Sequence, residues 1–179
     1  DAFVGWMVDQ KWPALWHAPV VAETYDGALN DINGQHVQRS HVYSALDAAT
    51  TEPVTEGAVG GGTGMVCNGF KGGIGTASRV VSVAEKSFVV GVLVQCNYNW
   101  GGDSLRLGDR WVFDDLPVGE HCYTDPGIAP QNPWFPYCSG AELNKDSPTR
   151  DGSIIVVVAT DAPILPHQLH RLAKRPSLA

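Results

Sequence analysis

A serine that directly follows a turn, at the head of an apolar run, is the residue of this chain best placed for nucleophilic chemistry. Ser153 follows Asp151-Gly152, a dipeptide typical of turns, and precedes the β-branched run 154–159. That run is short, apolar and bounded, which predicts a buried strand. If the chain is cut between Gly152 and Ser153, the freed α-amine, with a pKa of about 7.7–8, can act as the base for the hydroxyl. The alternative is an ordinary turn that leads into an ordinary strand.

A glycine-rich segment, residues 57–75, is the second unusual feature. It has neither the Gly-Lys-Ser/Thr of a phosphate-binding loop nor the residues of a dinucleotide-binding fingerprint. Because glycine has no Cβ, such a backbone can pass close to a nucleophile and present N–H groups to it. The alternative is a crowded turn in the core, with Lys71 as a solvated loop charge. The glycines that we assign to the backbone scaffold are Gly60, Gly61, Gly62 and Gly64.

The elements that must position these residues show both helix and strand patterns, which favours an α/β fold. Helices are predicted over residues 1–11, over 40–49 with Ser40 as N-cap, and from Pro166 until Pro176 ends the last one. Strands are predicted over residues 20–25, 80–84, 88–95, 110–113 and 153–159, with a hairpin turn at 85–87. The strand at 153–159 lacks polar alternation, so we expect it to be central and almost fully buried.

Composition excludes several classes of protein. A length of 179 residues with 44% hydrophobic and 17% charged residues indicates a single globular domain. The net charge of −7 and the pI near 5.2 argue against a nucleic-acid partner. No apolar run approaches the ~20 residues of a membrane helix. Residues 1–6 do not have the pattern of a signal peptide.

Histidines and cysteines do not form a recognisable metal site, and we predict neither a metal nor a cofactor. His167 and His170 are spaced i, i+3 without a second ligand pair nearby. Cys67 and Cys96 fall in segments that we expect to be buried, where a free cysteine is a small hydrophobic side chain. Cys122 and Cys138 bracket a proline-rich stretch, and a disulfide between them is plausible in an oxidising compartment.

Three stretches together resemble the L-aminopeptidase/D-esterase family typified by DmpA, which includes the β-peptidyl aminopeptidases. They are residues 19–34, 56–76 and 151–168, and they occur in the family's order, with the strand end at 94–98 between the last two. The resemblance implies an α-β-β-α sandwich of the N-terminal-nucleophile type, shared with ornithine acetyltransferases. It also implies a homo-oligomer of cleaved subunits that acts on small peptides, amides or esters.

The resemblance also implies roles for four residues. Ser153 attacks the Gly152 carbonyl, the resulting ester hydrolyses, and the mature Ser153 hydroxyl then forms an acyl-enzyme with the substrate. Asn97 donates to the oxyanion, Tyr25 is the active-site tyrosine, and Glu23 receives the free amine of the substrate. Without the family, Asn97 is a turn residue at a strand end, Tyr25 a core aromatic and Glu23 a buried ion-pair partner.

The chain also departs from the family pattern. Members of the family are longer at both ends, so we expect residues 1–179 to be an internal portion of a longer protein. A further serine and glutamate that support the nucleophile would then follow Ala179. Two other functions stay open: an inactive or precursor homologue that serves as a binding module, and an acyl transferase of the ornithine-acetyltransferase type, which uses threonine at the cut. The sequence does not choose between a cytoplasmic and a periplasmic location.

Overall fold

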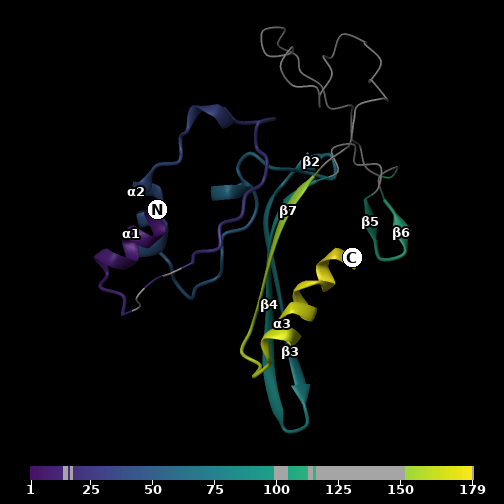
Figure 1. Ribbon diagram of the computed structural model, residues 1–179. Helices are drawn as coiled ribbons and strands as arrows, with labels where there is room; N and C mark the ends of the chain where they lie inside the picture. Colours follow the sequence, from purple (N-terminus) through teal and green to yellow (C-terminus); the bar gives the residue numbers. More distant parts are fainter. Residues whose placement is uncertain (14–15, 17, 99–104, 113–114, 116–151, 179) are drawn as a thin grey trace.

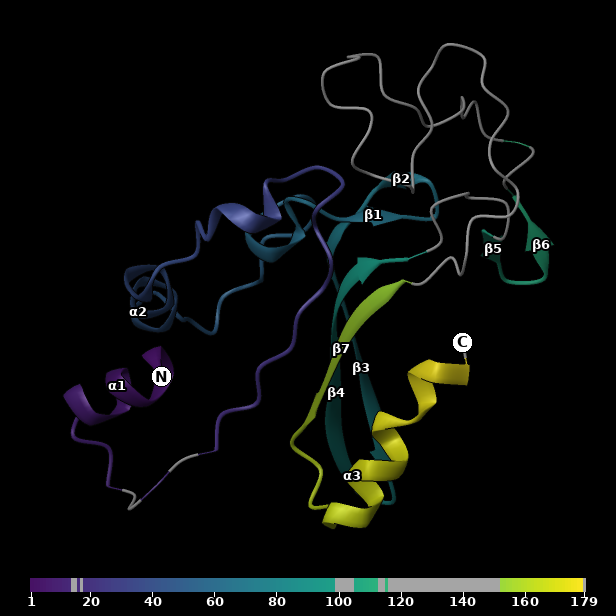
Figure 2. The same ribbon diagram turned by 45° about the horizontal axis from the view of Figure 1, so that its top comes forward.

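The main sheet has three antiparallel strands in the order β3-β4-β7, as the computed structural model in Figures 1 and 2 shows. The structure describes residues 1–13, 16, 18–98, 105–112, 115 and 152–178. The strands are β3 (Gly73–Val83), β4 (Lys86–Asn97) and β7 (Ser153–Thr160). Helix α3 (Pro166–Ala173) runs alongside this sheet, whereas α1 (Ala2–Asp9) and α2 (Arg39–Asp47) lie apart from it.

The predicted hairpin is confirmed as β3 and β4. Val83 is paired with Lys86, so the turn consists of Ala84 and Glu85, one residue earlier than predicted. Ala84 has a φ of 54°, the positive value that a two-residue hairpin turn requires. Strand β3 also extends back to Gly73, into the glycine-rich segment, where the sequence pattern did not indicate a strand.

The predicted strand at 153–159 is confirmed as β7, but its predicted position is wrong. In the described part of the sheet, β7 is an edge strand that pairs only with β4. Ile154 and Val157 are 51% and 53% exposed. A continuous apolar run indicates that both faces of a strand need cover, but it does not tell which neighbours the strand has in the sheet.

The predicted strand at 20–25 is wrong. These residues are not part of any strand, and Val20 and Val21 are 96% and 85% exposed. Strand propensity reflects packing against neighbouring strands, and this segment has none among the described residues. Its end nevertheless reaches the main sheet, because the Tyr25 N–H donates to Ser153 Oγ.

The three predicted helices are confirmed, with shifted ends. Helices α1 and α2 pack together through hydrogen bonds from Trp6 Nε1 to Asp47 (2.7 Å) and from Tyr43 to Asp9 (2.8 Å). The N-cap of α2 is Gln38 rather than Ser40. Helix α3 ends at Ala173, and a short 3₁₀ helix (Arg175–Leu178) carries the chain past Pro176.

The remaining described elements are short. Two short 3₁₀ helices are Ile32–Gly34 and Gly60–Gly62, and the second lies in the glycine-rich segment. The small strands are β1 (Val66–Cys67), β2 (Phe70–Lys71), β5 (Arg106–Leu107) and β6 (Arg110–Trp111). The strand predicted at 110–113 is present as β6 but ends before Val112, and residue 113 lies outside the described residues. None of the helices in the described ranges is long and apolar enough to cross a membrane.

Candidate active site

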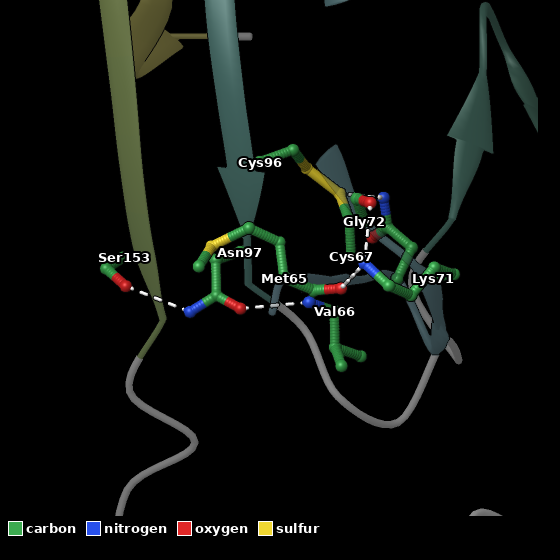
Figure 3. Close-up of a disulfide and its surroundings, with 9 residues drawn as sticks. Met65, Val66, Cys67, Lys71, Gly72, Cys96, Asn97 and Ser153 are labelled. Atoms are coloured by element: carbon green, nitrogen blue, oxygen red, sulfur yellow. Dashed lines mark hydrogen bonds between the residues drawn. A yellow bond between two sulfur atoms is a disulfide. The ribbon is translucent and has the colours of Figure 1, made fainter. Parts of the chain in front are cut away.

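Asn97 is the centre of the candidate site. It is the last residue of β4, it is only 1% exposed, and it lies opposite Ser153 in the β4–β7 pair. Its Oδ1 accepts a hydrogen bond from the Val66 N–H (3.0 Å), and its Nδ2 donates to the Tyr25 carbonyl (2.7 Å) and to Ser153 Oγ (3.0 Å). Figure 3 shows the amide between Val66 and Ser153. All the polar atoms of this buried side chain therefore have partners.

Two donors converge on the Ser153 hydroxyl oxygen. Besides Asn97 Nδ2, the backbone N–H of Tyr25 donates to Ser153 Oγ at 3.0 Å. Donors aimed at an oxygen favour its anionic form, so this arrangement stabilises negative charge on the nucleophile. The serine is half-buried, and Gly152 before it is exposed. The chemistry that the sequence predicts at Ser153 is therefore possible in this geometry.

Gly152 is tightly enclosed on one side although it is exposed. A Cβ placed on it would lie 2.7 Å from the Tyr98 Cα, closer than side-chain carbons approach backbone atoms. Glycine is therefore the residue type that fits directly before Ser153 without a shift of the backbone.

Tyr25 and Glu23 lie on the extended segment that reaches the start of β7. Both side chains are exposed, whereas the alternatives considered from the sequence placed them in the core. Tyr25 reaches Ser153 and Asn97 through its backbone, while its phenol oxygen lies 2.7 Å from the position of a Cβ on Gly27. Donation by the phenol stays a prediction. Glu23 is exposed and makes no hydrogen bond or ion pair within the described ranges, so the buried ion pair considered as its alternative is not found there.

The four scaffold glycines differ in their surroundings, and only Gly62 packs closely against other backbone segments. Gly62 is buried, and a Cβ on it would lie 2.7 Å from the Gly57 carbonyl oxygen and 2.8 Å from the Gly73 Cα. Gly60 has a φ of 52°, which favours glycine. Gly61 faces the Gln95 side chain, and Gly64 faces Asp26. Among the described bonds, the loop N–H that reaches the site belongs to Val66, which the sequence patterns did not indicate.

Lys71 is exposed, as the solvated loop charge considered from the sequence would be, but its ammonium group binds the loop. Its Nζ donates to the carbonyl oxygens of Gly62 (3.0 Å), Met65 (3.1 Å) and Gly72 (3.3 Å). Desolvation lowers the pKa of Lys71 below that of a free lysine. Lys71 therefore connects three carbonyl groups of the glycine-rich segment, a role that the sequence pattern did not indicate.

The prediction of free cysteines at positions 67 and 96 is wrong, because the two form a disulfide (Figure 3). Cys67 lies in β1 and Cys96 in β4, 29 residues apart in sequence, and no local pattern indicates that they pair. Cys122 and Cys138 lie outside the described residues. Within the described ranges, no group of three or more His, Cys, Asp or Glu side chains could hold a metal ion.

Comparisons with known proteins identify the family of the chain. The model of peptidase family S58 matches residues 1–179, the whole chain. The β-peptidyl aminopeptidase BapA of Sphingosinicella microcystinivorans is 53% identical over 178 residues, which are 98% of this chain and 41% of that protein. BapA of Sphingosinicella xenopeptidilytica is 45% identical over 160 residues, 89% of this chain and 37% of that protein. The chain thus spans about two fifths of the length of these relatives.

Solved structures confirm the predicted fold class. The β-aminopeptidase of a Burkholderia species matches with a TM-score of 0.75 at 45% identity, over 99% of this chain and 42% of that one. The L-aminopeptidase D-Ala-esterase/amidase of Ochrobactrum anthropi, a prototype of the serine aminopeptidases with a variant of the Ntn-hydrolase fold, matches with a TM-score of 0.75 at 46% identity, over 98% of this chain and 42% of that one. The fold is therefore an α/β sandwich of the N-terminal-nucleophile type, and the resemblance seen in the sequence is confirmed. The chain belongs to peptidase family S58.

Proposed function

We propose that the protein containing this chain is a self-cleaving serine aminopeptidase that also acts on amides and esters. The observation that carries the proposal is Ser153, whose Oγ lies 3.0 Å from both the Tyr25 N–H nitrogen and Asn97 Nδ2, directly after Gly152. The names of the relatives, which are β-aminopeptidases and an L-aminopeptidase D-Ala-esterase/amidase, support it.

Maturation is the first step of the proposed reaction. Ser153 Oγ attacks the Gly152 carbonyl carbon, the peptide C–N bond breaks, and an ester joins Gly152 to the serine oxygen. Water then hydrolyses the ester, which leaves a carboxylate on Gly152 and a free amine on Ser153. Before the cut, Tyr25 and Asn97 favour the ionised oxygen that attacks, because both donate to it.

Turnover uses the same oxygen. The free amine of Ser153 takes the hydroxyl proton, Oγ attacks the carbonyl carbon of the substrate, and the leaving amine or alcohol departs with a proton. Asn97 Nδ2 donates to the oxyanion, and water then releases the acyl group from Ser153. Glu23, an exposed carboxylate near the site, binds the α-ammonium of a short peptide, amide or ester. Tyr25 donates from its phenol near the oxyanion, as the family resemblance implies.

A larger assembly is part of the proposal. Residues 1–179 form an internal portion of one domain, and the serine and glutamate that support the nucleophile come from another part of the protein. The exposed apolar side chains of β7 and the two-fifths coverage of the relatives support this. The cleaved subunits form a homo-oligomer. Because disulfides persist in oxidising compartments, the Cys67–Cys96 bond favours a periplasmic over a cytoplasmic location.

Denaturing mass spectrometry combined with an activity assay tests this function. The wild-type protein is expected to give two chains that separate at Gly152–Ser153 and to hydrolyse aminoacyl p-nitroanilides. Ser153→Ala should give one uncut chain without activity, and Ser153→Thr, which keeps a hydroxyl, should still be cut. An uncut wild-type protein that turns over substrate contradicts the maturation step. A folded protein without hydrolysis indicates a binding module, and transfer of an acyl group to an amine acceptor without hydrolysis indicates an acyl transferase.

A further inference from the structure

The Cys67–Cys96 disulfide lies beside the hydrogen bond that holds the side chain of Asn97. Cys67 follows Val66 in β1, and Cys96 precedes Asn97 in β4, so each half-cystine is covalently next to one partner of that bond. The Cα atoms of the cysteines are 5.7 Å apart, a separation within the usual disulfide range of about 4.4–6.8 Å. The disulfide and the hydrogen bond therefore join the same two strand ends (Figure 3).

Two hydrogen bonds fix which way the amide of Asn97 points, one from the Val66 N–H to Oδ1 and one from Nδ2 to the Tyr25 carbonyl. A carboxamide has an acceptor oxygen on one side and an NH₂ donor on the other. With Oδ1 on the Val66 N–H, Nδ2 faces Ser153 Oγ and the Tyr25 carbonyl. Without the Val66 N–H, only the Tyr25 carbonyl would hold the amide in this orientation. The amide could then turn over more easily and present an acceptor to Ser153, and the donor for the oxyanion would be lost.

Non-covalent ties between β1 and β4 are few in the part of the chain that the structure describes. Strand β1 has two residues, pairs only with β2 and lies outside the three-stranded sheet. Besides the Val66–Asn97 bond, the Asn68 N–H donates to the Tyr98 carbonyl at 2.9 Å. Lys71 binds three carbonyls of the loop itself rather than β4. The covalent link is therefore the strongest described connection that keeps Val66 beside Asn97.

We propose that the Cys67–Cys96 disulfide is a positioning element of the active site. It keeps the Val66 N–H on Asn97 Oδ1, and it thereby keeps Asn97 Nδ2 directed at Ser153 and at the oxyanion. The intact disulfide raises kcat, whereas KM depends on other groups. This inference rests on the proposed aminopeptidase function.

The test uses mature, self-cleaved enzyme in a C122S/C138S background, in which Cys67 and Cys96 are the only cysteines of the sequence. A water-soluble phosphine breaks the S–S bond to two thiols and is oxidised to its phosphine oxide with oxygen from water. Because full loss of an oxyanion donor costs about 10²–10³ in kcat, we expect reduction to lower kcat about 10- to 30-fold. KM for an aminoacyl p-nitroanilide should change less than about twofold, and removal of the phosphine followed by air oxidation should restore kcat.

A purely stabilising disulfide gives a different result. In that case the reduced enzyme melts at a lower temperature but keeps its kcat at temperatures where circular dichroism shows it folded, and the proposal is overturned. Reduction that unfolds the enzyme at every temperature also overturns it.

The C67S/C96S variant provides a second measurement, and a wild-type kcat in that variant would contradict the positioning role as well. If the oxidised enzyme cleaves itself but hydrolyses no aminoacyl substrate, the proposed function fails, and the rate of cleavage at Gly152–Ser153 with and without the disulfide decides the positioning role.

Discussion

Asn97 and Ser153 lie opposite each other at the ends of β4 and β7, with Asn97 Nδ2 3.0 Å from Ser153 Oγ. The antiparallel register from Val90–Thr160 to Asn97–Ser153 brings the two residues together. A slip of one residue would turn every side chain of β7 to the other face of the sheet. The position of Ser153 beside Asn97 therefore depends on the register of the whole β4–β7 pair.

Replacement of Asn97 by alanine should lower kcat about 10²- to 10³-fold, since one oxyanion-hole donor is worth about 2.7–4 kcal/mol in a known protease. It also leaves the buried Val66 N–H without its acceptor, which should reduce the free energy of unfolding by about 1–3 kcal/mol. Steady-state kinetics and urea unfolding measure the two effects.

Two variants separate these effects. Asn97→Asp keeps an acceptor for Val66 and loses the donor, so it should have the kinetic defect even where the hydrogen bond from Val66 is retained. Asn30→Ala is the matched control, because the amide of Asn30 is exposed and donates to Asp26. A wild-type kcat in Asn97→Ala would remove Asn97 from the mechanism.

Replacement of Gly152 by alanine should slow self-cleavage by about tenfold or more. The added Cβ would lie 2.7 Å from the Tyr98 Cα, so the backbone at the scissile bond has to shift, and small shifts of reacting groups can cost up to about 100-fold in rate. The fraction of cut chain over time, measured by denaturing gel electrophoresis, gives the rate. Gly75→Ala is the control, because a Cβ there meets no atom within 4 Å. Equal rates for the two variants would show that crowding at Gly152 does not matter.

Replacement of Glu23 by glutamine should raise KM for aminoacyl amides and leave N-acetylated substrates nearly unaffected. A charge-assisted hydrogen bond contributes about 1.5–3 kcal/mol, so kcat/KM should fall roughly ten- to a hundredfold. Kinetics on matched free and acetylated p-nitroanilides measure the difference, with Glu52→Gln, another exposed acid, as control. Equal losses on both substrates would rule out a role for Glu23 in binding the ammonium group.

Replacement of Glu56 by glutamine should change the pH dependence of stability. The carboxylate of Glu56 accepts hydrogen bonds from the hydroxyl and the backbone N–H of Thr76. These bonds, the one from the hydroxyl most, lower the pKa of Glu56 below its ordinary value of 4.5. A carboxyl whose pKa is lower in the folded state stabilises the fold above its unfolded pKa, and this contribution is lost as the pH falls through the folded pKa. The wild-type protein should therefore melt at a higher temperature than Glu56→Gln at pH 6–7, and the difference should shrink towards pH 3.

The control for this prediction is Glu52→Gln, measured over the same pH range by differential scanning calorimetry. Glu56 connects the segment before the glycine-rich loop to β3, so loss of its hydrogen bonds should loosen the start of that strand. A constant difference in melting temperature between the wild-type protein and Glu56→Gln from pH 7 to pH 3 would show that ionisation of Glu56 does not contribute.

Local patterns in the sequence predicted the hairpin of β3 and β4, the strand after Gly152 and the helix that begins at Pro166, because these depend on neighbouring residues. They failed for residues 20–25, where apolar residues without a partner strand form an extended exposed segment. They also failed for the position of β7, since an apolar run does not specify its neighbours in the sheet.

At the site, the sequence alone determined the types of group available: a serine after a turn, an amide at a strand end and a glycine-rich loop. Only the tertiary structure decided how they meet. The β4–β7 register places Asn97 opposite Ser153, the loop places the Val66 N–H on Asn97, and the disulfide joins Cys67 to Cys96 across 29 residues. The physical reason is that these contacts join residues far apart in sequence, whereas local patterns report only the conformation of neighbouring residues.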